Sequence, residues 1–276
     1  MPAQKFVDVE KIIGSKNPRL LKWMPGFLLR YIKRILHETE VNDFMAKHGH
    51  LRDFDFIREV LDFMGVKIEV KGLENIPETG GFILAANHPL GGLDGMALMM
   101  AVGRKRKDIQ FLVNDILLSF GTMDALFVPV NKHGGQQKQR IEDAYASEHA
   151  VLIFPAGLVS RKNSGVIRDL EWKKSFIVKS QQYKKAVVPC FIDGKNSNWF
   201  YNLSLWRRRF GIKANVEMFY LGDEMFRQRD QTITIIFDKP VPSSKFNSSQ
   251  PPKQWAATMK EHVYALGSGR KGLFTE

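Results

Sequence analysis

Cysteine is nearly absent from this chain of 276 residues, in which Cys190 stands alone. A single cysteine cannot form an internal disulfide, and without a cluster of thiolates the sequence predicts neither a zinc ribbon nor an iron–sulfur centre. The seven histidines show no His-Glu-x-x-His or comparable spacing, so we expect no metal site. This usage favours a reducing compartment, the cytosol.

Long apolar runs are missing as well. The two longest, 96–102 and 186–192, have seven residues each, whereas a membrane-spanning helix needs about 20. Residues 1–16 mix charged and apolar side chains and lack the apolar core and cleavage site of a secretory signal. The sequence therefore predicts neither a signal peptide nor a transmembrane helix. We expect any membrane contact to be peripheral, at the cytoplasmic face of the inner membrane.

The chain has no internal repeat and no long Gly, Ser or Gln tract, and 44% hydrophobic with 25% charged residues is typical of a globular protein. Its 41 Lys and Arg against 29 Asp and Glu give a net charge of +12, which favours an anionic partner. Basic aromatic runs at 172–174 and 206–210 suit nucleic acid or a membrane interface. No nucleic-acid-binding signature accompanies them, so we expect an anionic membrane or an acidic carrier protein and no nucleic acid.

Residues 20–36 have the pattern of a basic amphipathic helix. Leu28, Ile32 and Ile35 recur at helical spacing, and the cations of the segment fall on the other side. Such a helix either packs its apolar stripe on its own domain or inserts it among the headgroups of an anionic membrane, and the pattern leaves both interpretations open. The candidate membrane-docking residues are Trp23, Phe27, Leu28, Tyr31, Ile32 and Ile35.

From Val66 onward, short apolar segments alternate with helical stretches, which is typical of an α/β domain. The expected strands are 67–70, 81–86, 109–113, 126–130, 150–154, 186–192 and 232–237. The expected helices are 53–64, 95–102, 136–147, 172–183 and 252–266. The sequence thus predicts a mixed β-sheet flanked by helices over 66–276, preceded by a helical lobe over 1–65.

A histidine and an aspartate flank the turn that follows the second expected strand. This strand leads into Asn87-His88-Pro89, two glycines then allow a tight turn, and Asp94 stands where the next helix begins. The carboxyl end of a buried strand is where α/β sheets usually place their sites. A carboxylate that accepts the N–H of one ring nitrogen leaves the other nitrogen as a base. The alternative is a turn histidine beside an aspartate that only caps the helix.

The chain resembles the glycerolipid (lysophospholipid) acyltransferase superfamily in several motifs and in their order. Asn87-His88-Pro89 with Asp94 is similar to its first motif, although five residues rather than the usual four separate histidine and aspartate. This longer form resembles the hemolysin-like branch, to which lyso-ornithine-lipid and related aminoacyl-lipid O-acyltransferases are similar. Further similar blocks follow in the family's order at 127–130, 154–157, 160–161, 187–191, 193–197 and 200–201.

The resemblance implies the acyltransferase fold and an acyl-transfer reaction. In the family the histidine, here His88, removes a proton from an acceptor hydroxyl, which attacks the thioester of acyl carrier protein or coenzyme A directly. No cofactor beyond this acyl donor is implied. The chain has no Gly-x-Ser-x-Gly motif, and Cys190 lies in an apolar strand pattern where a thiol is usually inert, which matches a reaction without an acyl-enzyme.

The block at 154–157 bears on the acceptor. Relatives usually carry glutamate where Ala156 stands, and often threonine and arginine where Leu158 and Val159 stand. Their absence makes a glycerol-phosphate acceptor less expected and favours a lysolipid with an amino-acid headgroup, such as a lyso-ornithine or lyso-glycine lipid. The alternatives are a 1-acylglycerol-3-phosphate acyltransferase and a non-catalytic membrane-binding or lytic protein. The candidate substrate-binding residues are Asn87, Lys132, Gly157, Ser160, Arg161 and Arg168.

Overall fold

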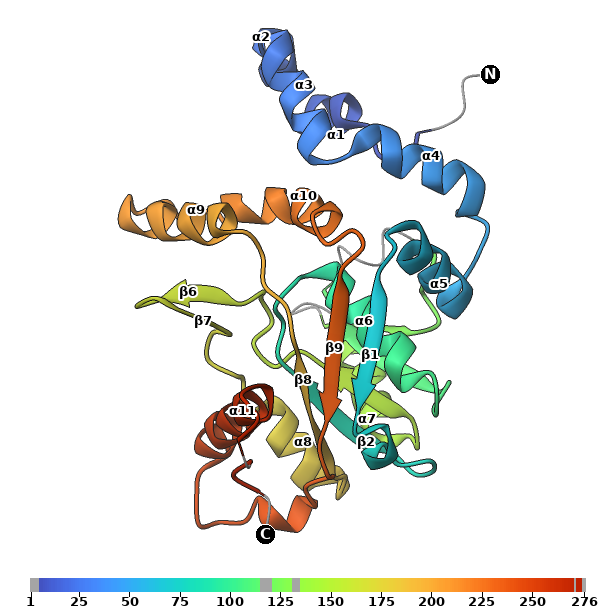
Figure 1. Ribbon diagram of the computed structural model, residues 1–276, viewed down its shortest axis with the longest axis vertical. Helices are drawn as coiled ribbons and strands as arrows, with labels where there is room; N and C mark the ends of the chain where they lie inside the picture. Colours follow the sequence, from blue (N-terminus) through green and yellow to red (C-terminus); the bar gives the residue numbers. More distant parts are fainter. Residues whose placement is uncertain (1–4, 115–120, 131–134, 271, 275–276) are drawn as a thin grey trace.

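A seven-stranded mixed β-sheet forms the centre of the protein (Figure 1). The computed structural model describes residues 5–114, 121–130, 135–270 and 272–274. In sheet order the strands are β1 (Lys67–Lys71), β9 (Thr232–Phe237), β8 (Val187–Ile192), β2 (Phe82–Ala86), β5 (Ala150–Ile153), β3 (Ile109–Val113) and β4 (Phe127–Pro129). Within this sheet β8 and β9 pair antiparallel, and the other neighbouring strands pair parallel. The expected mixed α/β architecture is confirmed.

Helices cover both faces of this sheet. One face packs against α5 (Asp53–Phe63) and α6 (Gly92–Val102), and the other against α7 (Gly135–Ala146), α8 (Ser175–Tyr183) and α11 (Pro252–Gly267). Strand β2 is buried along its whole length, since alternate side chains enter the two cores, as Leu84 and Ile83 do. A strand covered on both faces reads as a continuous apolar run, which is why the sequence revealed it.

The N-terminal lobe, at the top of Figure 1, contains four helices: α1 (Val9–Lys16), α2 (Pro18–Trp23), α3 (Gly26–Ile35) and α4 (Glu38–His48). The prediction of a single helix over 20–36 is therefore wrong, because the helix is interrupted at Pro25. Proline lacks an N–H and disfavours the helical conformation of the residue before it, and Met24 is extended with ψ 123°. None of the helices within the described ranges is long and apolar enough to cross a bilayer.

Helix α5 belongs to the core of the sheet domain, although it precedes the expected boundary at residue 65. Its side chains Phe56, Ile57, Val60 and Leu61 are buried, and the helix packs on α6. Helix α5 is therefore part of the packing on the sheet, and Phe44 of α4 joins the same core.

A segment that the sequence did not reveal lies between the lobe and the sheet in Figure 1. It consists of α9 (Asn198–Arg209), η3 (Val216–Tyr220) and α10 (Leu221–Phe226). The Tyr31 and Tyr220 hydroxyls hydrogen-bond at 2.9 Å, and the His37 ring stacks on Phe226 with centroids 3.8 Å apart. These contacts connect the lobe to the sheet domain. The remaining elements are the hairpin β6 (Arg161–Asn163) and β7 (Val166–Arg168) and the short helices η1 (Leu73–Asn75) and η4 (Ser243–Lys245).

Truncation of one α5 side chain tests this assignment. Leu61 is 4% exposed, so we expect Leu61→Ala to lower the free energy of unfolding by about 2–5 kcal/mol through lost burial and a cavity. Leu20 on α2 is 52% exposed, and Leu20→Ala should change that free energy by no more than about 0.5 kcal/mol. Denaturant unfolding followed by circular dichroism measures both. Equal effects of the two substitutions would contradict the assignment.

Candidate active site

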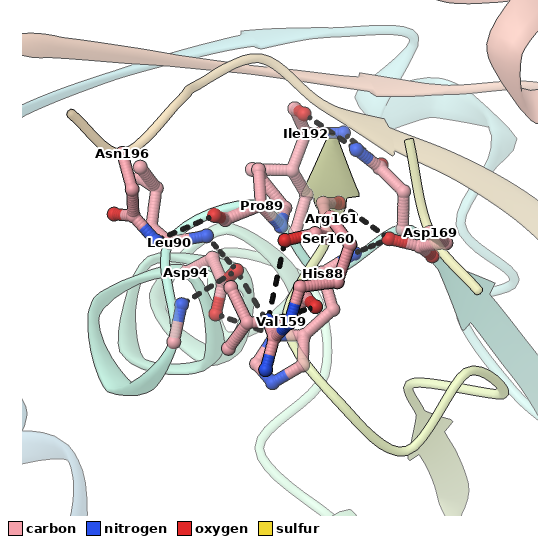
Figure 2. Close-up of polar contacts among 12 residues, drawn as sticks. His88, Pro89, Leu90, Asp94, Val159, Ser160, Arg161, Asp169, Ile192 and Asn196 are labelled. Carbon is pink, nitrogen blue, oxygen red and sulfur yellow. Dashed lines mark hydrogen bonds and ion pairs between the residues drawn. The ribbon is translucent and has the colours of Figure 1, made fainter. Parts of the chain in front are cut away.

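His88 and Asp94 meet at the carboxyl end of β2, as Figure 2 shows. The His88 Nδ1 atom lies 3.0 Å from Oδ2 of Asp94 and 3.1 Å from Oδ1. Asp94 is completely buried, whereas 16% of the His88 side chain is exposed. Because an ionised carboxylate can only accept hydrogen bonds, we assign the proton to Nδ1. The imidazole then presents Nε2 as a base.

The extra residue in this loop does not separate the pair, because the backbone at Gly91 has a φ of 98°. This left-handed conformation costs glycine little and is strained for residues with a Cβ. The turn brings the N–H groups of Leu90 and Gly91 to Oδ2 of Asp94, at 2.8 and 3.3 Å. Asp94 thereby satisfies N–H groups at the start of α6, where the helix dipole also favours a negative charge.

Phe154, at the end of β5, supports the imidazole ring. The two rings stack with centroids 4.0 Å apart and an interplanar angle of 14°. Within the described ranges, no residue hydrogen-bonds Nε2 of His88. One ring nitrogen is thus held by Asp94, one ring face by Phe154, and the other nitrogen can accept a proton from a hydroxyl group.

The His88 backbone is fixed by the loop that follows β5 and by Asp169. The Ser160 N–H donates to the His88 carbonyl at 2.7 Å, and the His88 N–H donates to Oδ1 of Asp169 at 3.2 Å. The same Asp169 carboxylate accepts from the Ser160 hydroxyl at 2.6 Å and from Trp172 Nε1 at 2.8 Å. Ser160 therefore acts on the site through the backbone of His88. Asp169 directly follows β7 and belongs to no recognisable motif, so it could not be predicted from the sequence.

Asn87 and Gly157 are occupied by backbone contacts. The Asn87 side chain donates to the Ile192 carbonyl at 2.8 Å and accepts its N–H at 2.7 Å, which holds the ends of β2 and β8 together. The Gly157 N–H donates to the Phe154 carbonyl at 2.9 Å in a turn where Gly157 has a φ of 68°. This N–H is not available to a developing oxyanion. Lys132 lies outside the described residues.

Arg161 is a buried residue in an ion-pair network. Its guanidinium pairs with Glu217 at 3.1 Å, and Arg207 pairs with the same carboxylate at 2.8 Å. Glu217 is completely buried and Arg161 is 4% exposed. Burial lowers the pKa of Arg161, and the Glu217 charge opposes this effect. The Arg161 charge is therefore neutralised within the protein, beneath α9.

Arg168 remains accessible at the surface. It pairs with Glu261 at 2.9 Å, lies over the Tyr264 ring and lines a cavity of about 470 Å³ between the β6–β7 hairpin and α11. Lys260 and Arg208 line the same cavity. Of the candidate cations placed by the structure, Arg168 is the one with a partly exposed side chain, at 32%.

The candidate docking residues differ in exposure. Trp23 and Phe27 are 82% and 68% exposed, and Leu28 and Tyr31 are less so. Ile32 is half-buried, and Ile35 is 7% exposed where the end of α3 approaches Gly222 of α10. The structure removes Ile35 from the candidate docking residues, because this end of α3 packs against the rest of the protein.

Cys190 lies in β8 and is completely buried. Burial raises the pKa of its thiol well above the usual value, so the thiol stays protonated and is a poor nucleophile. The described residues contain no group of three or more His, Cys, Asp or Glu side chains placed to hold a metal ion.

Three comparisons with known proteins show what the chain is similar to. The sequence matches the family described as Acyltransferase over residues 11–268. A protein of Bacteroides thetaiotaomicron named lyso-glycine lipid O-acyltransferase is 44% identical over 265 residues, which cover 95% of this chain and 97% of that protein. One of the same name from Phocaeicola vulgatus is 40% identical and covers 95% of each chain. The crystal structure of the 1-acyl-sn-glycerophosphate (LPA) acyltransferase from Thermotoga maritima superposes with a TM-score of 0.44 at 14% identity, covering 86% of this chain and 95% of that one.

A stability measurement tests the structural role of Arg161. We expect Glu217→Gln to lower the free energy of unfolding by about 3–5 kcal/mol, because it leaves the buried Arg161 and Arg207 charges without their shared partner. Glu261→Gln removes a partly exposed pair and should cost no more than about 1 kcal/mol. Denaturant unfolding compares the two variants. Equal small effects would mean that the Arg161 charge is not balanced by Glu217.

Proposed function

Because the chain belongs to the acyltransferase family, we propose that it moves a fatty acyl group from a thioester donor to the hydroxyl of a lyso-glycine or related lyso-aminoacyl lipid. The observation that carries the proposal is the His88–Asp94 pair, in which a buried carboxylate holds Nδ1 at 3.0 Å beneath a partly exposed ring. The acceptor follows the names of the two relatives, which are similar to this chain over nearly its whole length.

The proposed reaction needs one base and no acyl-enzyme. Nε2 of His88 takes the proton of the acceptor hydroxyl as its oxygen attacks the thioester carbonyl, and Asp94 stabilises the imidazolium that forms. The tetrahedral intermediate then collapses, the carbon–sulfur bond breaks, and the imidazolium returns its proton to the leaving thiolate. The new ester and the free thiol are the products, and His88 is again neutral.

The donor is acyl carrier protein or coenzyme A carrying the acyl chain. Both present the thioester on an arm that contains phosphate, and the net charge of +12 favours their approach. We propose Arg168, in the cavity beside α11, as a contact for a phosphate of the donor or for the headgroup carboxylate of the acceptor.

The protein is proposed to act as a peripheral protein at the cytoplasmic face of the membrane. The exposed side chains Trp23, Phe27, Leu28 and Tyr31 of α2 and α3 support this proposal, since burial of apolar area among headgroups drives interfacial binding.

Substitution of the pair tests the mechanism. We expect His88→Ala to abolish acyl transfer, and Asp94→Asn to lower kcat by roughly 10²- to 10⁴-fold, because the imidazole loses the partner that fixes its tautomer. Transfer of a radiolabelled acyl chain to lyso-glycine lipid, with each donor in turn, measures the rates. His50 is exposed, and His50→Ala should leave the rate unchanged. Near-parental turnover by folded His88→Ala would overturn the mechanism.

A competition between acceptors tests the substrate class. The loop after β5 places Ala156 and Val159 in buried positions, at 6% and 2% exposure, where relatives with a phosphate acceptor carry polar groups. Loss of two charge-assisted hydrogen bonds, worth roughly 1.5–3 kcal/mol each, should lower the preference for lysophosphatidic acid by about two orders of magnitude or more. With equal lyso-glycine lipid and lysophosphatidic acid present, we expect diacylated glycine lipid as the product. Predominant phosphatidic acid would make the protein a 1-acylglycerol-3-phosphate acyltransferase instead.

A further inference from the structure

A continuous series of aromatic side chains runs from the N-terminal lobe to α9. Tyr31 of α3 hydrogen-bonds Tyr220 of η3, the Tyr220 ring lies 6.0 Å from that of Trp199, and the Trp199 ring lies 6.1 Å from that of Trp206. Phe27 and Phe210 extend the series, one helical turn before Tyr31 and one after Trp206. We call Phe27, Tyr31, Tyr220, Trp199, Trp206 and Phe210 the aromatic band.

The aromatic band is exposed at both of its ends. Phe27 is 68% exposed, Trp206 50% and Phe210 76%. Large aromatic side chains of soluble proteins are mostly buried, and a contiguous exposed group of them marks a surface that binds a membrane, another protein or a ligand. The Tyr31–Tyr220 hydrogen bond and the ring contacts of Trp199 with Tyr220 and Trp206 keep these four side chains together, so they join two segments far apart in the sequence.

Cations border the band on both segments. Arg30 and Arg34 are exposed on α3, and Arg208 and Arg209 are exposed at the end of α9. Arg34 lies over the Tyr31 ring, 5.3 Å from its centroid. Within the described part of the chain, none of these four arginines has a carboxylate at ion-pair distance. Their charges are available to an external anionic surface, in contrast to Arg207, which pairs with Glu217.

The inner side of the α9–η3–α10 segment covers the turn from His88 to Asp94, which we call the catalytic loop. Phe200 and Tyr201, on the buried face of α9, pack in one cluster with Val159, and Leu221 joins them. A Cβ atom placed on Gly91 would lie 3.4 Å from the Leu221 side chain. The segment that carries four of the six residues of the aromatic band is therefore the covering layer over the turn that joins His88 to Asp94.

We infer that the aromatic band lies on the surface of an anionic phospholipid bilayer, so that α9 and η3 form a second membrane contact beside α2 and α3. The inference rests on the proposed function, since a lysolipid acceptor resides in such a bilayer. Aromatic rings suit the headgroup region, and the bordering arginines are attracted to anionic lipids. Two contacts, one on the N-terminal lobe and one on the covering layer, fix the orientation of the protein, and the catalytic loop then lies directly beneath the covering layer.

Vesicle binding by the full chain tests the inference. We expect the parent protein to sediment with phosphatidylglycerol vesicles, more weakly at high salt and more weakly with phosphatidylcholine alone. Trp206→Ser with Phe210→Ser should weaken that binding by about tenfold or more, because both rings lose their apolar burial. The matched control, Val178→Ser with Leu273→Ser, removes exposed apolar side chains outside the band and should change binding by less than about twofold. Circular dichroism and thermal melting check that the variants fold.

The outcomes separate this inference from the proposed function. Unchanged vesicle binding by the folded Trp206→Ser, Phe210→Ser variant, or no vesicle binding by the parent, would overturn the inference. If light scattering shows that the parent is a dimer and the double variant a monomer, with vesicle binding intact, the band is an interface with a second copy of the chain. If the parent binds nucleic acid but not vesicles, the band is a nucleic-acid-binding surface. Acyl transfer by the parent to a short-chain, water-soluble lyso-glycine lipid tests the proposed function independently of any membrane.

Discussion

The burial of one carboxylate governs the arrangement of the site. Asp94 has no exposed surface, and a buried negative charge without partners would cost several kcal/mol. Its partners are the His88 imidazole and the N–H groups of Leu90 and Gly91, all within the turn that leads into α6. The need to satisfy this charge therefore fixes the turn, the first turn of the helix and the tautomer of the histidine together. The positive φ of Gly91 allows a loop with one additional residue to meet the same requirement.

A second buried carboxylate organises the layer above the site. Glu217 takes Arg161 from the start of the β6–β7 hairpin and Arg207 from α9, and so joins two elements that are otherwise far apart in the sequence. Glu224 does the same for α10, since it accepts the Ser197 N–H just before α9. Both acidic residues lie in a part of the chain rich in arginine and aromatic side chains. Here buried polar contacts rather than a large apolar core hold the polypeptide over the catalytic loop.

This difference explains what the sequence predicted and what it missed. Strands such as β2 and β8 lie in a sheet that is covered on both faces, so their continuous apolar runs were sufficient to predict them as strands. The limits of two further strands, Ile109–Val113 and Thr232–Phe237, were predicted to the residue. The His88–Asp94 pair was also predicted, because a motif and a strand end coincide there. The α9–η3–α10 segment has no clear apolar period, and its order depends on charges paired across long separations. Asp169 and Glu217 escaped prediction for the same reason, since local sequence does not show which carboxylate will be buried.

Helix α9 has two faces that meet opposite demands. Its inner face holds Phe200 and Tyr201 against Val159 of the loop after β5, where the proposed proton transfer would benefit from exclusion of water. Its outer face carries Trp199 and Trp206, which remain partly exposed. A helix that only packed on the site would be amphipathic, with a polar outer face. Aromatic side chains therefore lie on both faces of α9, and its charged side chains are the arginines at its end. This distribution accounts at once for the weak amphipathic pattern of the helix and for its position between the catalytic loop and the surface.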